Sequence, residues 1–174
     1  MSHQPHDRGD AEVVLRAAVL TVSSSVAAGD AQDHSGQALA DAAAQQAQVV
    51  RSDVVADDQA AIEAWLRERV AEGIELIFTT GGTGLTPDDV TPEATLAVID
   101  RAVPGIAEAM RAESLRHTPQ AMLSRALAGS AKMSLIVNFP GSPSAISDLF
   151  PVLAPVLRHA VATLHRHDGH LQRQ

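Results

Sequence analysis

Residue types that bind phosphate and divalent cations are concentrated in segment 79–92, which has the sequence TTGGTGLTPDDVTP. It combines backbone that can approach a ligand closely with two hydroxyl groups: Thr80, Gly81, Gly82, Thr83 and Gly84. Asp88 and Asp89 add carboxylates that suit a divalent cation. The segment matches neither the Gly-Lys-Ser/Thr phosphate loop nor the Gly-x-Gly-x-x-Gly dinucleotide loop. It predicts a phosphate-plus-metal site, and the alternative is a tight strand-to-helix turn without a ligand.

A second pair of acids, Asp57 and Asp58, follows the predicted strand 48–55. One of them is expected to cap the next helix, because an aspartate side chain accepts hydrogen bonds from the free amides of a first helical turn. The two acid pairs could share one Mg²⁺, since this ion favours one or two carboxylates together with substrate phosphates and water. The sequence therefore predicts a magnesium site between two strand ends.

Segment 138–143, Asn-Phe-Pro-Gly-Ser-Pro, is a second candidate anion site. Ser142 followed by Pro143 is typical of a helix start, and the first amides of a helix attract anions. The alternative is ordinary capping by Ser142 without a ligand. Ser23 follows another predicted strand. Its hydroxyl group is expected to bind substrate or to stabilise a turn, because no Gly-x-Ser-x-Gly motif surrounds it.

Strands and helices alternate along the chain. Apolar runs predict buried strands at 13–23, 48–55, 74–79 and 134–137. Helical spacing predicts five helices: 37–46, from the acids at 57–58 to Gly73, 91–99, 106–115, and one from 142 onward. Pro151 and Pro155 should kink or divide the last helix. This alternation predicts an α/β fold with a mostly parallel sheet covered by helices on both faces. The polar segments should then meet where the strands end.

Composition limits the classes of function. The 174 residues suffice for one domain, expected at 13–166 between flexible tails at 1–12 and 167–174. A net charge of −8 argues against nucleic acid and anionic lipid as partners, and no apolar run is expected to span a membrane. The chain has no cysteine, and segment 1–10 lacks the apolar stretch of a signal peptide. These features favour a cytoplasmic protein.

Segment 80–95 closely resembles the signature of the MoaB/Mog family of molybdenum-cofactor biosynthesis proteins. Leu123-Ser124-Arg125 agrees with it, and segment 138–143 is similar to the family's Asn-Leu-Pro-Gly-Ser-Pro. The resemblance implies a three-layer αβα sandwich of the molybdopterin-binding-domain type. It also implies adenylylation of molybdopterin by ATP and Mg²⁺ with release of pyrophosphate. The implied assembly is a homotrimer or a hexamer (a dimer of trimers), and a molybdenum-insertion protein is an implied partner.

The resemblance assigns roles to residues of this chain. The two family aspartates needed for the reaction fall on Asp57 and Asp89, which we expect to be catalytic and to bind Mg²⁺. Contacts to molybdopterin and its phosphate are expected from Ser23, Thr80, Gly81, Gly82, Thr83, Gly84, Ser124, Asn138, Pro140, Gly141 and Ser142. The chain departs from the family at Ser24 and Ser25, where Asp-Arg is frequent, and at Asp88, where an arginine is common. These departures remove positive charge near the expected phosphates. The alternative function is a non-catalytic molybdopterin-binding carrier or scaffold.

Overall fold

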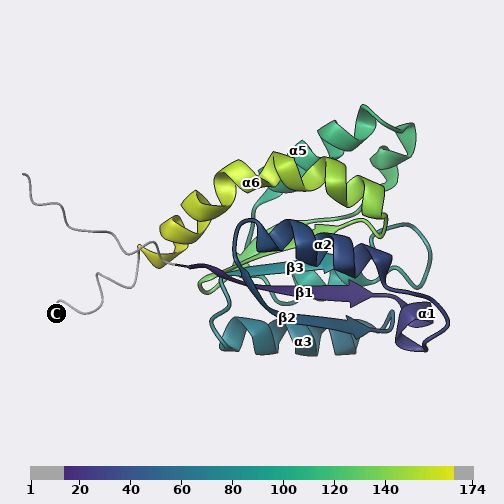
Figure 1. Cartoon of the computed structure of the whole chain (residues 1–174), viewed down its shortest axis with the longest axis horizontal. Coiled ribbons are helices and arrows are strands. Elements are labelled where there is room, and N and C mark those ends of the chain that lie inside the picture. The colour runs from purple at the N-terminus through teal and green to yellow at the C-terminus, as the bar shows by residue number, and fades with distance from the viewer. Residues whose placement is uncertain (1–13, 167–174) are drawn as a thin grey trace, which may run out of the picture.

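The computed structural model of the chain describes residues 14–166 as one six-stranded sheet with helices on both faces (Figure 1). The strands are β1 Arg16–Val22, β2 Gln48–Val55, β3 Leu76–Thr80, β4 Arg101–Ala102, β5 Ala128–Ala131 and β6 Ser134–Phe139. The helices are α1 Ser24–Ala27, α2 His34–Ala44, α3 Gln59–Ala71, α4 Thr91–Leu96, α5 Pro104–Leu115, the 3₁₀ helix η1 Pro119–Leu123, and α6 Pro143–His165. The predicted tails at 1–12 and 167–174 lie outside the described residues.

The strand order is β2-β1-β3-β6-β5-β4. β2, β1, β3 and β6 are parallel, whereas β5 runs antiparallel to both of its neighbours. Four strands therefore end at one rim of the sheet. The chain first passes from β1 to β2 and then places β3 on the other side of β1, so the strand order reverses between β1 and β3. In open α/β sheets, ligands bind at such a reversal point, beyond the carboxyl ends of the strands.

Each face of the sheet carries its own apolar cluster. Val19 and Phe78 pack with α2, α5 and α6 on one face. Their chain neighbours Leu20 and Ile77 pack with α3 and α4 on the other face. This arrangement follows from strand geometry, because successive side chains point to opposite faces and parallel strands are buried on both. Figure 1 shows α3 on the side of the sheet opposite α2 and α6, which gives the three layers expected from the resemblance.

Helix α6 continues through Pro151 and Pro155 as one helix, and its ribbon bows in Figure 1. Of the two predicted outcomes, a kink or a division, the division into two helices is therefore wrong. By length and composition α6 could also cross a membrane, which corrects the expectation that no apolar run is long enough. It is nevertheless a core helix, because its buried residues pack against the sheet: Ile146, Leu149, Phe150, Leu153, Leu157 and Val161.

The sheet is larger than the sequence predicts. The four predicted strands correspond to β1, β2, β3 and β6, and β2 has the predicted bounds. β4 has only two residues, and β5 consists of Ala-Gly-Ser-Ala. Neither sequence has much intrinsic strand preference, so they become strands because β5 pairs with β6 and β4 pairs with β5. Helix α4 begins at Thr91, as predicted, and ends at Leu96 rather than continuing through Ile99.

Candidate functional site

The loops that follow β3 and β6 touch each other at the rim. The Gly81 amide donates a 3.2 Å hydrogen bond to the Phe139 carbonyl oxygen. Thr80 Oγ1 donates a 2.8 Å hydrogen bond to the Pro140 carbonyl oxygen. A Cβ atom on Gly141 would lie 3.4 Å from Cα of Gly81, so the two loops approach each other as bare backbone. The two segments that the sequence indicates as anion sites therefore form one continuous surface.

Gly81 and Gly82 are required by packing. They have φ angles of 94° and 64°, in the left-handed region. A Cβ atom would lie 2.3 Å from the Val22 carbonyl oxygen at Gly81, and 2.4 Å from Thr91 Oγ1 at Gly82. Thr91 fixes the turn, because its Oγ1 donates a 2.9 Å hydrogen bond to Gly81 O and its amide donates a 3.1 Å bond to Gly82 O. The tight-turn alternative thus accounts for these two glycines without a ligand.

Two cavities of small-molecule size open on either side of this turn. The first has a volume of about 390 Å³ and lies between the β3–α4 loop, α5 and η1. Its wall is mostly apolar and includes four residues predicted to contact substrate: Thr83, Gly84, Ser124 and Pro140. The second has a volume of about 360 Å³, lies at the reversal point between β1 and β3, and is lined by Ser23, Gly81 and Gly141 among others. Seven of the predicted contacts therefore line a cavity.

Arg125 fixes the β3–α4 loop through hydrogen bonds to its carbonyl oxygens. Its Nε donates a 2.7 Å hydrogen bond to Gly84 O, and its Nη2 donates a 2.6 Å bond to Asp89 O. Its amide donates a 2.9 Å bond to Thr83 O. Its Nη1 pairs with the carboxylate of Glu93 at the start of α4. A guanidinium presents five donors in one plane, so a single side chain can fix several points of the loop at once.

Asp89 is held as an anion within this loop. Its Oδ2 accepts hydrogen bonds of 2.8 Å from the Thr86 amide and 2.7 Å from Thr86 Oγ1. Burial alone would raise the pKa of Asp89, but the Thr86 bonds, a hydrogen bond from the Gly84 backbone and the Arg125 charge hold it below its ordinary value of 3.8. The hydrogen bond from Arg125 likewise lowers the pKa of Glu93 below its ordinary value of 4.5.

These two lowered pKa values predict an acid-dependent loss of stability. A carboxyl group whose pKa falls on folding stabilises the native state above its ordinary pKa, and that contribution disappears as pH falls. The free energy of unfolding should therefore begin to decrease near pH 4.5 and continue to decrease below 3.8, as these two carboxylates take up protons. Urea unfolding at pH 7, 4 and 3 measures this dependence. Arg125→Met should weaken it, whereas Arg51→Met should leave it as in the parent protein; equal slopes in all three proteins would contradict the assignment.

Asp57 belongs to a different turn. The Ser24 amide and Ser24 Oγ donate hydrogen bonds of 2.8 and 2.7 Å to Asp57 Oδ2, and the Asp57 amide donates a 3.1 Å bond to Ser24 Oγ. Within residues 14–166, Asp57 Oδ1 makes no hydrogen bond. Asp58 is the N-cap of α3, because its Oδ1 accepts a 2.7 Å bond from the Ala61 amide. Of the two acids, Asp57 is therefore the one left for a role at the rim.

Asp57 and Asp89 lie on either side of β1. The loops that carry them follow β2 and β3, which flank β1 and are separated by two strand spacings, about 10 Å. The two carboxylates share no hydrogen-bond partner in the described part of the chain. In the same part, no cluster of three or more His, Cys, Asp or Glu side chains is arranged to hold a metal. A cation bound here would thus depend on one or two carboxylates and on substrate oxygens.

Asn138 and Thr80 are buried beneath the rim and make hydrogen bonds that position its loops. Asn138 is fully buried, and its Nδ2 donates hydrogen bonds of 2.9 Å to both Thr79 Oγ1 and Thr95 Oγ1. Its Oδ1 accepts a 3.4 Å bond from the Leu127 amide. Thr80 is also fully buried, and its hydroxyl group is used in the bond to the β6 loop. Direct substrate contact by these two side chains is not supported, and positioning of the loops is the role that their geometry favours.

Ser142 and Ser23 act as helix caps. Ser142 Oγ accepts a 3.4 Å hydrogen bond from the Ala145 amide at the start of α6. Ser23 Oγ accepts a 3.3 Å bond from the Val26 amide in α1. The capping alternative therefore holds for both residues. Ser142 is exposed and Ser23 is half-buried, and substrate binding by them stays a prediction.

Two residues near the cavities are not among the site residues predicted from the sequence. Arg111 of α5 lines the first cavity, and its Nη1 donates hydrogen bonds of 2.8 Å to Ala126 O and 3.4 Å to Ser124 O. His34, the first residue of α2, lines the second cavity. Both come from helices rather than from strand ends, and no local pattern distinguishes them from surface residues. Only the packing of α2 and α5 on the sheet places them there.

The chain has an α/β fold with a candidate small-molecule site at the rim of its sheet. Residues 18–159 match the family described as "Probable molybdopterin binding domain". The chain belongs to this family of molybdopterin-binding proteins, of the MoaB/Mog type, as the resemblance of its glycine loop indicates.

Related proteins agree with this assignment. The chain is 44% identical over 140 residues to the molybdopterin adenylyltransferase of Haemophilus influenzae, covering 78% of this chain and 71% of that protein. It is 38% identical to the molybdenum cofactor biosynthesis bifunctional protein of Chlorobaculum tepidum, covering 92% of this chain and 51% of that protein. The chain thus spans about half the length of some of its curated relatives. The fold is similar to the crystal structure of the molybdopterin biosynthesis enzyme MoaB from Thermus thermophilus, with a TM-score of 0.82 and 42% sequence identity. The superposition covers 87% of this chain and 96% of that chain.

Proposed function

We propose that this protein transfers the adenylyl group of ATP to molybdopterin and releases pyrophosphate. The observation that carries the proposal is the placement of an ionised Asp89 next to Gly84 in the wall of the first cavity, with the second cavity at the reversal point of the sheet. A site of this kind suits two anionic substrates that must be brought together. The relatives named as molybdopterin adenylyltransferases supply the identity of the two substrates.

The reaction needs positioning more than it needs proton transfer. An oxygen of the molybdopterin phosphate would form the new bond to the α-phosphorus of ATP, and the bond from that phosphorus to the pyrophosphate oxygen would break. The attacking phosphate is already an anion, so no general base is required. This agrees with the rim, where the hydroxyl groups of Ser23 and Ser24 have no activating histidine among their described hydrogen-bond partners. Holding two substrates in line accounts for much of the rate in phosphoryl-type transfers.

Asp57 and Asp89 are the residues that would hold Mg²⁺. Their donor chemistry fits, because Asp57 has an unused carboxylate oxygen within the described residues and Asp89 stays ionised at neutral pH. Mg²⁺ binds through one or two carboxylates together with phosphate oxygens and water. Such an ion supplies neutralisation of the negative charge that develops on the leaving pyrophosphate.

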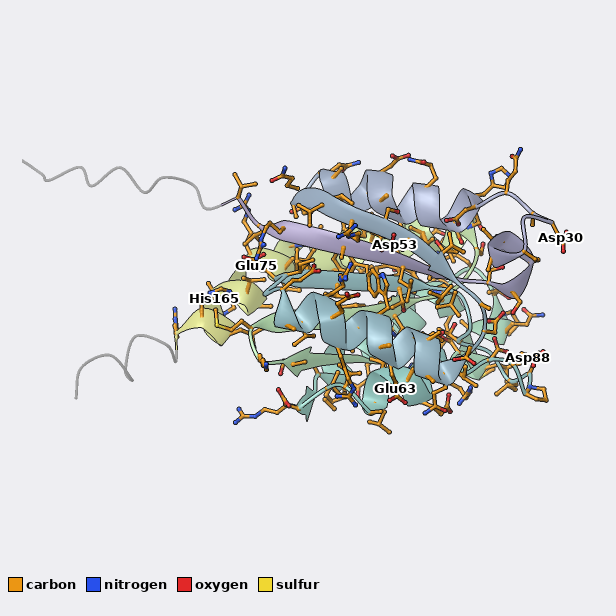
Figure 2. All side chains as sticks on the ribbon, turned by 90° about the horizontal axis from the view of Figure 1, so that it is seen from below. Asp30, Asp53, Glu63, Glu75, Asp88 and His165 are labelled. Atoms are coloured by element: carbon orange, nitrogen blue, oxygen red, sulfur yellow. The ribbon has the colours of Figure 1, made fainter. Side chains whose placement is uncertain are left out.

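The chain's own groups have distinct tasks in this proposal. The lining of the second cavity contains no lysine or arginine, so hydroxyl and amide donors near Ser23, Gly81 and Gly141 must bind phosphate there. The mostly apolar first cavity suits a flat ring system, with Arg111 available at its wall. The departures from the family fit this division: Ser24 holds Asp57 in place, and Asp88 is exposed at the outer end of the loop (Figure 2).

Pyrophosphate release tests the proposal. Purified protein with ATP, Mg²⁺ and molybdopterin should release pyrophosphate in a ratio of one to each adenylylated pterin, and omission of molybdopterin should abolish the release. Tight molybdopterin binding without any pyrophosphate release would overturn the proposal. That outcome would favour the alternative of a non-catalytic carrier or scaffold.

Further expectations belong with this function. We propose a cytoplasmic protein that assembles as a homotrimer or a hexamer and passes its product to a molybdenum-insertion protein. The net charge of −8 supports the absence of nucleic acid and membrane from its partners. Light scattering of the purified protein would measure the assembly.

A further inference from the structure

A group of basic side chains at the end of the sheet opposite the rim makes no hydrogen bond or ion pair with the described residues 14–166. Within residues 14–166, four lysine or arginine side chains make no hydrogen bond or ion pair: Arg51, Arg101, Lys132 and Arg166. Three of these four line a single cavity. Acidic residues outnumber lysines and arginines by 21 to 13, so unpaired cations gathered in one place require a separate explanation.

This cavity lies between β4, the β5–β6 turn and the C-terminal end of α6, and its volume is about 870 Å³. The sequence neighbours of His165, Leu164 and Arg166, line this cavity. Figure 2 shows His165 at the end of the molecule opposite Asp88. Asp100 is the acid in its wall; it accepts a 2.8 Å hydrogen bond from the Lys132 amide and forms no ion pair with the three cations. The C-terminal dipole of α6 favours one nearby cation. It does not account for three.

A hydroxyl group in the wall of the cavity is free to bind a ligand. Ser130 lines the same cavity, and its hydroxyl oxygen is accessible and makes no hydrogen bond within residues 14–166. Ser130 is paired directly with Arg101 across β4 and β5. The hydroxyl group and the guanidinium are therefore neighbours that could donate to the same ligand.

Lys132 is the only lysine of the chain, and its place in the fold is unusual. Its φ angle is 50°, which is the left-handed region that glycine, asparagine and aspartate occupy most easily. The backbone of this turn therefore gives no reason for a lysine. A role for its ammonium group in the cavity would give one.

We propose that this cavity binds a phosphorylated small molecule with at least two negative charges, at a site separate from the rim. Ammonium and guanidinium groups are the side chains that bind phosphate most strongly, and three of them exceed the charge of Asp100. The cavity is also large enough for more than one phosphate group. The proposal does not depend on the reaction at the rim.

Calorimetric titration with inorganic pyrophosphate tests this site, with EDTA present to exclude magnesium-dependent binding at the rim. We expect Lys132→Asn and Arg101→Gln to weaken binding at least tenfold. Asparagine tolerates a positive φ angle, so the melting temperature of Lys132→Asn should equal or exceed that of the parent protein. This separates loss of binding from loss of folding.

Two controls make the result decisive. Arg51→Gln removes the fourth unpaired cation, which lies on β2 and not in the cavity, so it should bind pyrophosphate like the parent protein. Asp89→Asn, which changes the rim, should also leave this binding unchanged. Unweakened binding in Lys132→Asn and Arg101→Gln, an equal loss in Arg51→Gln, or no binding by the parent protein would each overturn the proposal.

Discussion

Asparagine in place of either Asp57 or Asp89 is expected to reduce adenylylation of molybdopterin by about a thousandfold or more. The substitution keeps the shape of the side chain and one acceptor oxygen. Ser24 at the first position and Thr86 at the second can therefore still donate hydrogen bonds, and the turns should persist. What disappears is the negative charge that would hold Mg²⁺. Single-turnover release of pyrophosphate measures the rate, and fluorescence titration measures pterin binding, which should change less than about threefold.

Neighbouring acids provide matched controls. Asp58→Asn should retain activity and stability, because asparagine caps a helix about as well as aspartate does. Asp88→Asn should also retain activity, since Asp88 is exposed and makes no hydrogen bond within the described residues. Full activity in both Asp57→Asn and Asp89→Asn would refute the assignment. Similar losses in all four variants would show that the summed negative charge of the rim, rather than two particular carboxylates, determines the rate.

The parts of the fold that can be predicted from sequence are those whose own residues determine them. The bounds of β2, the cap of α3 among Asp57 and Asp58, and the start of α6 at Ser142 and Pro143 all follow from local rules. β4 and β5 do not, because their short and small-residue sequences become strands only when β5 pairs with β6 and β4 pairs with β5. The continuity of α6 through Pro151 and Pro155 is similarly a result of packing, since its apolar face is buried along the sheet on both sides of the prolines.

The loops of the site can be predicted, but the task of each side chain cannot. Thr80 and Asn138 occur in the right segments, yet they are buried and hold the ends of β3 and β6. Glycines at 81 and 82 suggest access for a ligand, although Val22 and Thr91 occupy the space that side chains there would need. Arg125 fixes the loop from 36 residues beyond Asp89 in sequence. Such distant contacts leave no spacing or periodicity that a sequence could reveal.

Gly81→Ala is expected to lower the free energy of unfolding by about 3 kcal/mol or more and to abolish activity with it. The backbone at Gly81 has a φ angle of 94°, which an alanine adopts only with strain. The added Cβ atom would also lie 2.3 Å from the Val22 carbonyl oxygen, and a strand backbone cannot move away as a flexible side chain could. The loop after β3 must then shift from β1, which displaces Asp89 relative to Asp57. Urea unfolding at pH 7 measures the cost.

Gly105→Ala distinguishes this steric cause from a general intolerance of alanine. Gly105 lies in the first turn of α5, has no positive φ angle, and offers open space around an added Cβ atom. Alanine is the better helix former, so this variant should be as stable as the parent protein or more stable by up to about 1 kcal/mol. If Gly81→Ala were as stable as Gly105→Ala, the close approach of the β3–α4 loop to β1 could not be what fixes the geometry of the rim. The positions of Asp57 and Asp89 on either side of β1 would then need another support.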